Sequence, residues 1–335
     1  MLIALQPGMK QRLDNRLSVS VMLGIILDAD SLGKEIDLSP ITGLLDEWRV
    51  YGSSLPEDTS ARVADADVVL SNKIRLDATN LNGSQVSFIS VMATGTNNID
   101  LEYTSNRGIT VSNAVAYATP SVVQHTISLI LALSTNLSAY LKDVREGAWQ
   151  KSNVFCLLQH PIQEVSGKQL GIIGHGELGN AVADAATGLG LEILISDRPG
   201  NSPKEGRLAF KEVVARADYL SLHCPLTDGN QQMINAEVLS AMKPSAFLIN
   251  TARGGLVDSE ALIAALKAGD IAGAAIDVLD VEPATVDEPL ITDIDNLLVT
   301  PHNAWGAIES RNRLIEQMRE NIEGFLADQP QRQVN

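Results

Sequence analysis

The chain has 335 residues, of which 45 % are hydrophobic and 20 % are charged. At roughly 150 residues per domain this length predicts two domains with sizeable cores, and the composition excludes a disordered or low-complexity chain. The 41 acidic residues outnumber the 25 basic ones, and the net charge of −16 argues against binding to nucleic acid or to an anionic membrane, because phosphate neutralisation needs clustered Lys and Arg. Cys156 and Cys224, the two cysteines, exclude a disulfide scaffold and a cysteine-rich zinc module, and they suit a reducing cytoplasm.

Residues 1–21 are expected to form an extension ahead of the first strand. Basic residues precede the apolar run 19–27, as they do in a signal peptide. The run is short, however, has no small-residue cleavage site and leads directly into Asp28 and Asp30. No stretch reaches the roughly 18 apolar residues of a membrane span. We therefore expect a cytoplasmic protein without a membrane segment.

Short apolar strands alternate with helical stretches, a pattern typical of parallel α/β sheets. Early strands are predicted at 21–27, 68–70, 86–91 and 109–111. A long helix is predicted over 119–146, with Thr119 as N-cap and Pro120 at the first helical position. Apolar residues occupy almost every side of this helix, so we expect the helix to be buried. Later strands are predicted at 169–173, 192–196, 219–222, 246–250, 273–277 and 297–300, with helices at 259–268 and 307–328.

A glycine-rich turn, Gly174-His-Gly-Glu-Leu-Gly179, stands between a predicted strand and a predicted helix. This is the G-x-G-x-x-G pattern in the context that a dinucleotide site requires. Gly174 permits the tight turn, Gly176 lets the backbone approach a pyrophosphate, and Gly179 permits close packing of the helix. Backbone N–H groups near Glu177 and Leu178 would bind the phosphate charge.

Asp197 stands at the end of the next predicted strand. An acidic side chain in this place binds the adenosine ribose hydroxyls and repels a 2′-phosphate, which favours NAD over NADP. The neighbouring Arg198 could pair with a 2′-phosphate, so the choice of cofactor stays open at this point.

Three candidate catalytic residues, Arg253, Glu282 and His302, each stand just beyond a predicted strand. Ligands of open α/β sheets bind at the carboxyl ends of strands. An Arg fork binds a carboxylate bidentately, and a His exchanges protons near neutral pH. A Glu that holds one imidazole nitrogen favours the charged ring. These three side chains together suit a site that binds a 2-oxo acid and protonates its carbonyl oxygen.

From about residue 22 onward the chain resembles the D-isomer-specific 2-hydroxyacid dehydrogenase family, and within it the glycerate dehydrogenases, also called hydroxypyruvate reductases. The resemblance rests on the glycine-rich turn and on six further motifs: Leu70-Ser-Asn-Lys73, Ala93-Thr-Gly-Thr-Asn-Asn-Ile-Asp100, Phe155-Cys-Leu-Leu158, His223-Cys-Pro-Leu-Thr227, Asn250-Thr-Ala-Arg-Gly-Gly255 and Pro301-His-Asn-Ala-Trp305.

The resemblance implies two Rossmann-like α/β domains with parallel sheets, one flavodoxin-like and one NAD-binding, with a cleft between them. The substrate domain would comprise 22–118 and 303–335, and the NAD-binding domain 119–302. The middle helix and the arm after it would form the interface of a homodimer.

The resemblance also implies further site residues. Asp277 would contact the nicotinamide carboxamide. Other cofactor contacts would come from Thr96, Cys224, Thr251 and Ala252. Substrate contacts would come from Asn72, Lys73, Thr94, Gly95 and Trp305. His125, inside the long helix, is expected to be a structural hydrogen-bonding residue, and no pattern of metal ligands occurs in the sequence.

The implied function is reduction of hydroxypyruvate or glyoxylate to D-glycerate or glycolate with NADH. Arg253 would clamp the carboxylate, His302 would donate the proton, and Glu282 would stabilise the imidazolium. Two alternatives stay open. One is another D-2-hydroxyacid dehydrogenase, of the D-lactate or phosphoglycerate type, and the other is a catalytically poor protein that senses NAD(H).

Overall fold

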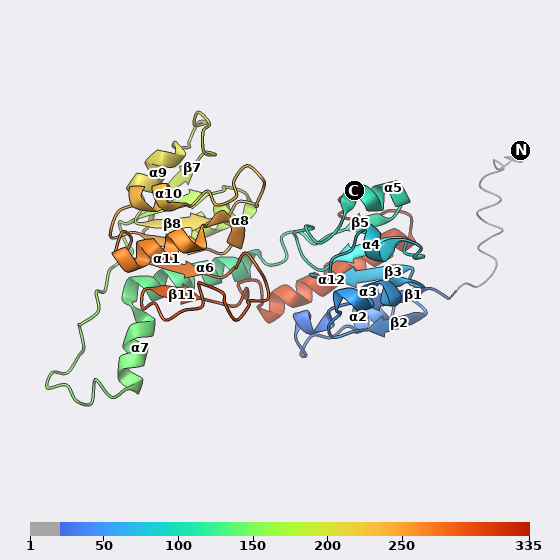
Figure 1. Cartoon of the computed structure of the whole chain (residues 1–335), viewed down its shortest axis with the longest axis horizontal. Coiled ribbons are helices and arrows are strands. Elements are labelled where there is room, and N and C mark those ends of the chain that lie inside the picture. Colours follow the sequence, from blue (N-terminus) through green and yellow to red (C-terminus); the bar gives the residue numbers. More distant parts are fainter. Residues whose placement is uncertain (1–20) are drawn as a thin grey trace, which may run out of the picture. The chain divides into compact units, whose positions relative to one another are not determined.

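A computed structural model describes residues 21–335, which divide into two compact units (Figure 1). Unit 1 comprises the chain up to Tyr117 together with Ile308–Asn335, and unit 2 comprises Ala118–Ala307. The resemblance implies domain boundaries at 118/119 and 302/303, and the compact units change at 117/118 and 307/308. Residues 1–20 of the predicted extension lie outside the described part of the chain.

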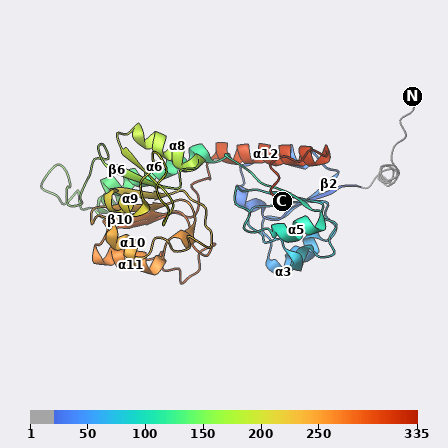
Figure 2. The same cartoon turned by 90° about the horizontal axis from the view of Figure 1, so that it is seen from above.

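Unit 1 contains a parallel sheet with the strand order β2-β1-β3-β4-β5. Its strands are β1 (Leu23–Ile26), β2 (Glu47–Val50), β3 (Val68–Ser71), β4 (Phe88–Val91) and β5 (Thr110–Ser112). Its helical segments are η1 (Ala29–Leu32), α2 (Ser39–Thr42), α3 (Pro56–Val63), α4 (Ala78–Leu81), α5 (Leu101–Arg107) and α12 (Ile308–Leu326). In Figure 2, α12 covers one face of this sheet, and α3 and α5 lie on the other. The edge strand β2 is absent from the sequence-based prediction, because it has no continuous apolar run.

Unit 2 contains a second parallel sheet, with the order β11-β10-β9-β8-β6-β7. Its strands are β6 (Gln169–Ile173), β7 (Glu192–Ser196), β8 (Tyr219–Leu222), β9 (Phe247–Asn250), β10 (Gly273–Ile276) and β11 (Leu297–Val299). Its helical segments are α6 (Thr119–Thr135), α7 (Leu137–Arg145), α8 (Glu177–Thr187), α9 (Phe210–Arg216), α10 (Ala236–Ala241), η2 (Gly254–Leu256) and α11 (Ser259–Ala268). One hydrophobic cluster includes buried residues of α6 and α8, and another includes those of α9, α10 and α11. The predicted fold class, two parallel α/β domains, is confirmed.

The prediction of one long helix over 119–146 is wrong. Asn136 adopts the left-handed conformation (φ 49°), which Asn tolerates better than most residues, and it separates α6 from α7 with a bend of 63°. Ala118 occupies the N-cap position, and the Thr119 hydroxyl instead donates a hydrogen bond to the carboxylate of Glu177. The expected burial is also wrong in part, because Leu131 is exposed and α7 buries no residue.

The residues from 21 onward include no single helix with both the length and the apolar composition of a membrane span. Only the bent pair of α6 and α7 passes that test jointly.

Each sheet reverses its strand order at one point. In unit 2 the chain goes from β6 to β7 on one side and then to β8 on the other, and in unit 1 the same happens around β1 and β3. Open α/β sheets bind ligands outside the carboxyl ends of strands at such points. The loops after these strands are therefore where a site is expected in each unit.

Candidate active site

The turn between β6 and α8 forms a cradle that side chains would fill. Gly174 has φ of 96°, and a Cβ there would lie 2.5 Å from the backbone nitrogen of Cys224. A Cβ on Gly179 would lie 2.0 Å from the carbonyl oxygen of Gly174. Gly176, the N-cap of α8, has open space around the position of a Cβ. The helix N-terminus therefore faces free volume, as binding of a pyrophosphate requires.

A cavity of 570 Å³ opens beside this turn. It is lined by residues after β6, β7 and β8, among them Gly176, Asp197 and Cys224. The cavity thus lies at the reversal of strand order in unit 2. The cradle, the helix N-terminus and the cavity together fit a dinucleotide cofactor.

Asp197 is buried at the edge of this cavity, and both of its carboxylate oxygens accept backbone hydrogen bonds. The N–H of Arg198 lies 2.7 Å from Oδ1, and the N–H of Lys204 lies 3.0 Å from Oδ2. These bonds hold the pKa of the Asp197 carboxyl below its ordinary value, and the bond from Lys204 has the largest effect. The group is therefore an anion that also fixes the following loop. Arg198 and Arg207 line the same cavity.

His223, which follows β8, is a cavity residue to which the sequence analysis gives no role. It is half-buried, its Nε2 lies 2.9 Å from Oγ of Ser221, and burial lowers the pKa of its imidazole to about 4. Burial also raises the pKa of the neighbouring Cys224 thiol. Both side chains are therefore neutral at pH 7. Its place at the reversal of strand order is the signal that could have identified His223.

Glu282 and His302 form the closest polar pair among the predicted catalytic residues. Nδ1 of the imidazole lies 2.6 Å from Oε2 of the carboxylate, and both side chains are about a quarter exposed (27 % and 29 %). The backbone N–H of Leu279 donates to Oε1 of Glu282 at 2.9 Å and orients the carboxylate. Because Nδ1 faces Glu282, Nε2 is the nitrogen through which the ring can exchange a proton with a ligand.

Arg253 follows β9, the neighbour of β10 in the sheet. The side chain of Asn250 braces this turn by donating to the Arg253 carbonyl (2.9 Å) and accepting from the Ala252 N–H (3.0 Å). A Cβ on Gly254 would lie 2.0 Å from the carbonyl carbon of Leu279, so only glycine permits this close approach. The Arg253 turn is thus packed against the loop that orients Glu282.

Asp277, buried at the end of β10, fixes the turn that carries His302. Its carboxylate accepts from the Thr300 hydroxyl (2.6 Å) and from the N–H groups of Asn303 (3.1 Å) and Ala304 (3.0 Å). Its carbonyl accepts from the N–H of His302 at 2.8 Å, and His302 adopts a φ of 51°. The contact predicted between Asp277 and a nicotinamide stays a prediction, whereas its contacts with the turn are direct.

His125 reaches this turn from α6. Its Nε2 lies 3.1 Å from Oγ1 of Thr300 and 3.4 Å from Oδ1 of Asp277. Burial acts to raise the pKa of Asp277, but the hydrogen bonds from His125 and Thr300 outweigh it and the pKa is lowered. His125 therefore supports the anionic form of a carboxylate that positions His302.

The remaining predicted residues of unit 2 lie at the same strand ends. Thr251 is buried with its hydroxyl 3.1 Å from that of Thr126, Ala252 lies in the Arg253 turn, and Trp305 is half-buried after the His302 turn. Among the described residues, no three His, Cys, Asp or Glu side chains are grouped so that they could hold a metal ion.

Five predicted residues lie in unit 1 instead, after β3 and β4. The backbone N–H groups of Asn72 and Lys73 donate to the carboxylate of Asp28 at 2.9 and 2.7 Å. Burial raises the pKa of Asp28 despite these bonds. Sequence reasoning assigned Asp28 no role, because these contacts join strands that are far apart in the chain.

The other three residues, Thr94, Gly95 and Thr96, lie in the loop after β4. Thr94 is exposed, and the other two are half-buried. The unit 1 residues therefore gather at the carboxyl ends of three parallel strands, β1, β3 and β4.

Comparison with known proteins gives consistent matches. The family model described as "D-isomer specific 2-hydroxyacid dehydrogenase, NAD binding domain" matches residues 127–304. The glycerate dehydrogenase of Methylorubrum extorquens is 40 % identical over 289 residues, covering 85 % of this chain and 91 % of that protein. The hydroxypyruvate reductase of Blautia hydrogenotrophica is 34 % identical over 284 residues, covering 83 % and 88 %. A solved structure of D-lactate dehydrogenase from Aquifex aeolicus, complexed with NAD and lactic acid, has a TM-score of 0.78 at 25 % identity and covers 92 % of this chain and 96 % of that one.

The family model spans more than half of the chain, and the strand and glycine-rich turn that it includes form the cradle described above. The chain therefore belongs to the D-isomer-specific 2-hydroxyacid dehydrogenase family, as an NAD-dependent oxidoreductase.

Proposed function

We propose that this enzyme reduces hydroxypyruvate or glyoxylate with NADH and yields D-glycerate or glycolate. The observation that carries the proposal is the Glu282–His302 pair at 2.6 Å, with the Arg253 turn packed against the loop that orients Glu282. Among the relatives, the glycerate dehydrogenase and the hydroxypyruvate reductase support this substrate class.

In the proposed mechanism, the guanidinium of Arg253 binds the substrate carboxylate with two parallel hydrogen bonds and polarises the adjacent carbonyl. When bound, NADH supplies the hydride that adds to C2. Nε2 of His302 gives its proton to the carbonyl oxygen, so that C=O becomes CH–OH. Glu282 stabilises the positive charge of the imidazolium before the transfer and keeps the ring oriented.

Unit 2 offers the groups that would hold the cofactor. The N-terminus of α8 at Gly176, Glu177 and Leu178 would bind the pyrophosphate. The anionic Asp197 would bind the adenosine ribose hydroxyls and disfavour a 2′-phosphate, so NADH is the expected cofactor. Thr251 and Cys224, beside the same strand ends, are proposed to line its path.

In unit 1, the loop 94–97 is proposed to donate backbone N–H groups to the substrate carboxylate. Asn72 and Lys73, whose backbone is fixed by Asp28, are proposed to bind the same anion. Cations and N–H donors suit a small anionic substrate, since the net charge of −16 gives the chain no overall attraction for anions.

The test is loss of NADH absorbance with hydroxypyruvate, glyoxylate, pyruvate and 3-phosphohydroxypyruvate, repeated with NADPH. We expect the highest kcat/KM with hydroxypyruvate or glyoxylate and NADH, and D-glycerate as the product from hydroxypyruvate. Preference for pyruvate or for the phosphorylated acid would assign a D-lactate or phosphoglycerate type. Tight NADH binding without turnover of any 2-oxo acid would instead favour a sensor of NAD(H).

We further propose a cytoplasmic homodimer that buries the arm after α7. Large apolar side chains lie exposed there, including Trp149 (52 %), Phe155 (89 %) and Leu158 (75 %). Exposed apolar side chains concentrated in one segment support an interaction site there. Light scattering should give twice the chain mass, and Phe155→Asp should shift it toward one chain mass. A monomeric wild-type protein would refute the dimer.

A further inference from the structure

The substrate loop of unit 1 is held by a side chain outside it. Nδ2 of Asn113, the residue after β5, donates to the carbonyl oxygen of Thr94 at 2.8 Å. A backbone bond from the N–H of Ala114 to the carbonyl of Ala93 (3.0 Å) ends just before the loop. Among the described contacts, the Asn113 amide is thus the side-chain donor that forms a hydrogen bond with the loop 94–97.

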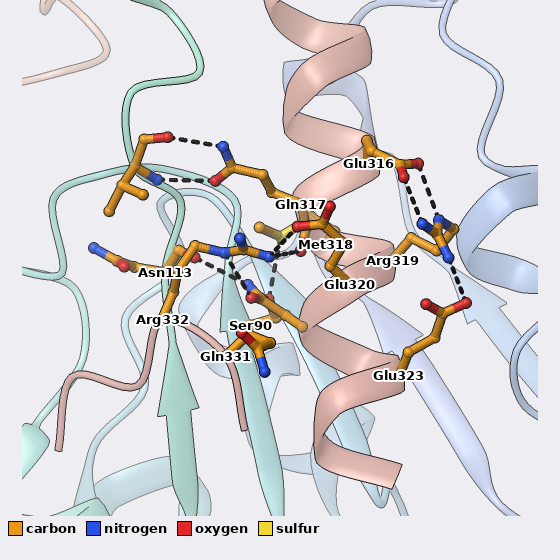
Figure 3. Close-up of polar contacts among 12 residues, drawn as sticks. Ser90, Asn113, Glu316, Gln317, Met318, Arg319, Glu320, Glu323, Gln331 and Arg332 are labelled. Carbon is orange, nitrogen blue, oxygen red and sulfur yellow. Dashed lines mark hydrogen bonds and ion pairs between the residues drawn. The ribbon is translucent and has the colours of Figure 1, made fainter. Parts of the chain in front are cut away.

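Asn113 is itself fixed by α12. The buried Asn321 donates from Nδ2 to the Asn113 carbonyl (2.9 Å) and to Oγ of Ser90 in β4 (3.1 Å). Gln317, one helical turn earlier, accepts from the N–H of Val115 (2.9 Å) and donates to its carbonyl (2.8 Å). Figure 3 shows Ser90, Asn113, Gln317 and Arg332 together in this network of polar contacts.

The segment 331–335 completes the support. The guanidinium of Arg332 donates to Oδ1 of Asn321 (2.9 Å), to the Gln317 carbonyl (3.0 Å) and to Glu320 (2.7 Å), and the Arg332 carbonyl accepts from the N–H of Asn113 (3.2 Å). Val334 then donates to the Val111 carbonyl in β5 at 2.9 Å. The segment therefore ties α12 to the strand that carries Asn113.

We propose that Asn113 is a positioning residue for substrate binding, held in place by Asn321 and Arg332, so that α12 and segment 331–335 set the geometry of the loop 94–97. The inference rests on the proposed function, in which this loop binds the carboxylate of the 2-oxo acid. Asn113 acts through the Thr94 carbonyl, and the adjacent peptide N–H groups then point in a fixed direction. A preorganised donor costs a ligand less ordering than a mobile one, so the effect falls on substrate affinity.

The first test compares three variants by steady-state kinetics. Asn113→Ala removes the bond to Thr94, and Asn321→Asp keeps an acceptor for Arg332 while losing the donor to Asn113. Asn321→Asp also loses the bond to Oγ of Ser90. We expect KM for the 2-oxo acid to rise about threefold to tenfold in both variants, the range expected when a hydrogen bond that orients the loop is lost. The affinity for NADH, measured by fluorescence, and kcat should change by less than about twofold. Arg319→Gln is the matched control, because Arg319 pairs with Glu316 and Glu323 on another side of the same helix (Figure 3).

A fourth variant separates this inference from the proposed function. Gly95→Pro removes a backbone N–H from the loop itself, so it should raise KM whether or not Asn113 matters. If Gly95→Pro raises KM and Asn113→Ala does not, the positioning role of Asn113 is refuted, and the loop 94–97 keeps its proposed role in binding the substrate. If neither raises KM, both assignments fail. An equal rise with Arg319→Gln would also refute the inference, because it would indicate a general loss of stability.

Amide hydrogen exchange gives a readout that needs no substrate. We expect faster exchange in peptides that cover 93–99 for Asn113→Ala and Asn321→Asp, and unchanged exchange for Arg319→Gln. Asn113→Asp, which keeps the shape of the side chain but loses the donor, replaces Asn113→Ala if that protein does not fold. Unchanged exchange in the loop of both amide variants would refute the inference.

Discussion

Replacing His223 with Gln should reduce the loss of stability that the protein suffers in mild acid. Burial lowers the pKa of this imidazole from 6.5 to about 4 in the folded protein. Between these values the unfolded chain binds a proton that the folded chain does not. His223 therefore costs the folded protein no stability above about pH 6.5. The free energy of unfolding falls as the pH is lowered from there toward 4.

The magnitude follows from the two pKa values. Linkage of one group titrating at about 4 when folded and 6.5 when unfolded gives a loss of about 2 kcal/mol between about pH 7 and pH 5. Gln keeps a polar group near Oγ of Ser221 but has no proton to gain, so its variant lacks this loss. Groups that titrate elsewhere contribute equally to both proteins and cancel in the difference.

Urea unfolding at the two pH values, followed by circular dichroism, measures the effect. The drop in the free energy of unfolding should be about 2 kcal/mol larger for the wild type than for His223→Gln. Ser221→Ala is the control: it removes the hydrogen bond but not the burial, so it should keep the acid sensitivity of the wild type. Equal pH dependence of wild type and His223→Gln, or an NMR titration of His223 near 6.5, would refute the reasoning.

Three further predictions concern the chemistry. His302→Gln should lower kcat about 10²- to 10⁴-fold with unchanged NADH affinity, and wild-type kcat in this variant would contradict its role as proton donor. Glu282→Gln keeps the shape of the side chain but removes its charge beside Nδ1, so kcat should fall about tenfold, and steady-state rates with saturating 2-oxo acid measure this. Arg253→Lys should raise KM for the 2-oxo acid about tenfold because the bidentate fork is lost, while the fluorescence titration with NADH stays as in the wild type.

The elements predicted best from the sequence are the first three strands of unit 2. The ranges 169–173, 192–196 and 219–222 predicted from the sequence are those of β6, β7 and β8, because each is a short, mainly apolar stretch of the kind that forms a strand of a parallel sheet. The break at Asn136 could not be predicted in the same way, since Asn is compatible with both a helix and a left-handed turn. In the structure the Asn136 side chain donates to the carbonyl of Pro161, a contact 25 positions away that local sequence does not reveal.

The candidate site shows the same division. Glu282 and His302 could be identified because each stands just beyond a predicted strand, and the structure places them in contact. The role of Asp28 and the neutral state of His223 were not predictable, although the place of His223 at the reversal of strand order marks it as a site residue. One depends on hydrogen bonds to residues more than 40 positions away, and the other on a pKa set by burial in the folded state. Local patterns carry no information about either.

Unit 1 is built from two separate pieces of the chain, and this imposes an order on biosynthesis. Unit 2 is contiguous, so all of its strands leave the ribosome before α12 does. Asn321 and segment 331–335, which brace β4 and β5, emerge only afterwards. Until then the edge of β5 is unpaired and able to associate with another nascent chain. Unit 1 can thus complete its fold only after the whole of the domain inserted into it has been synthesised.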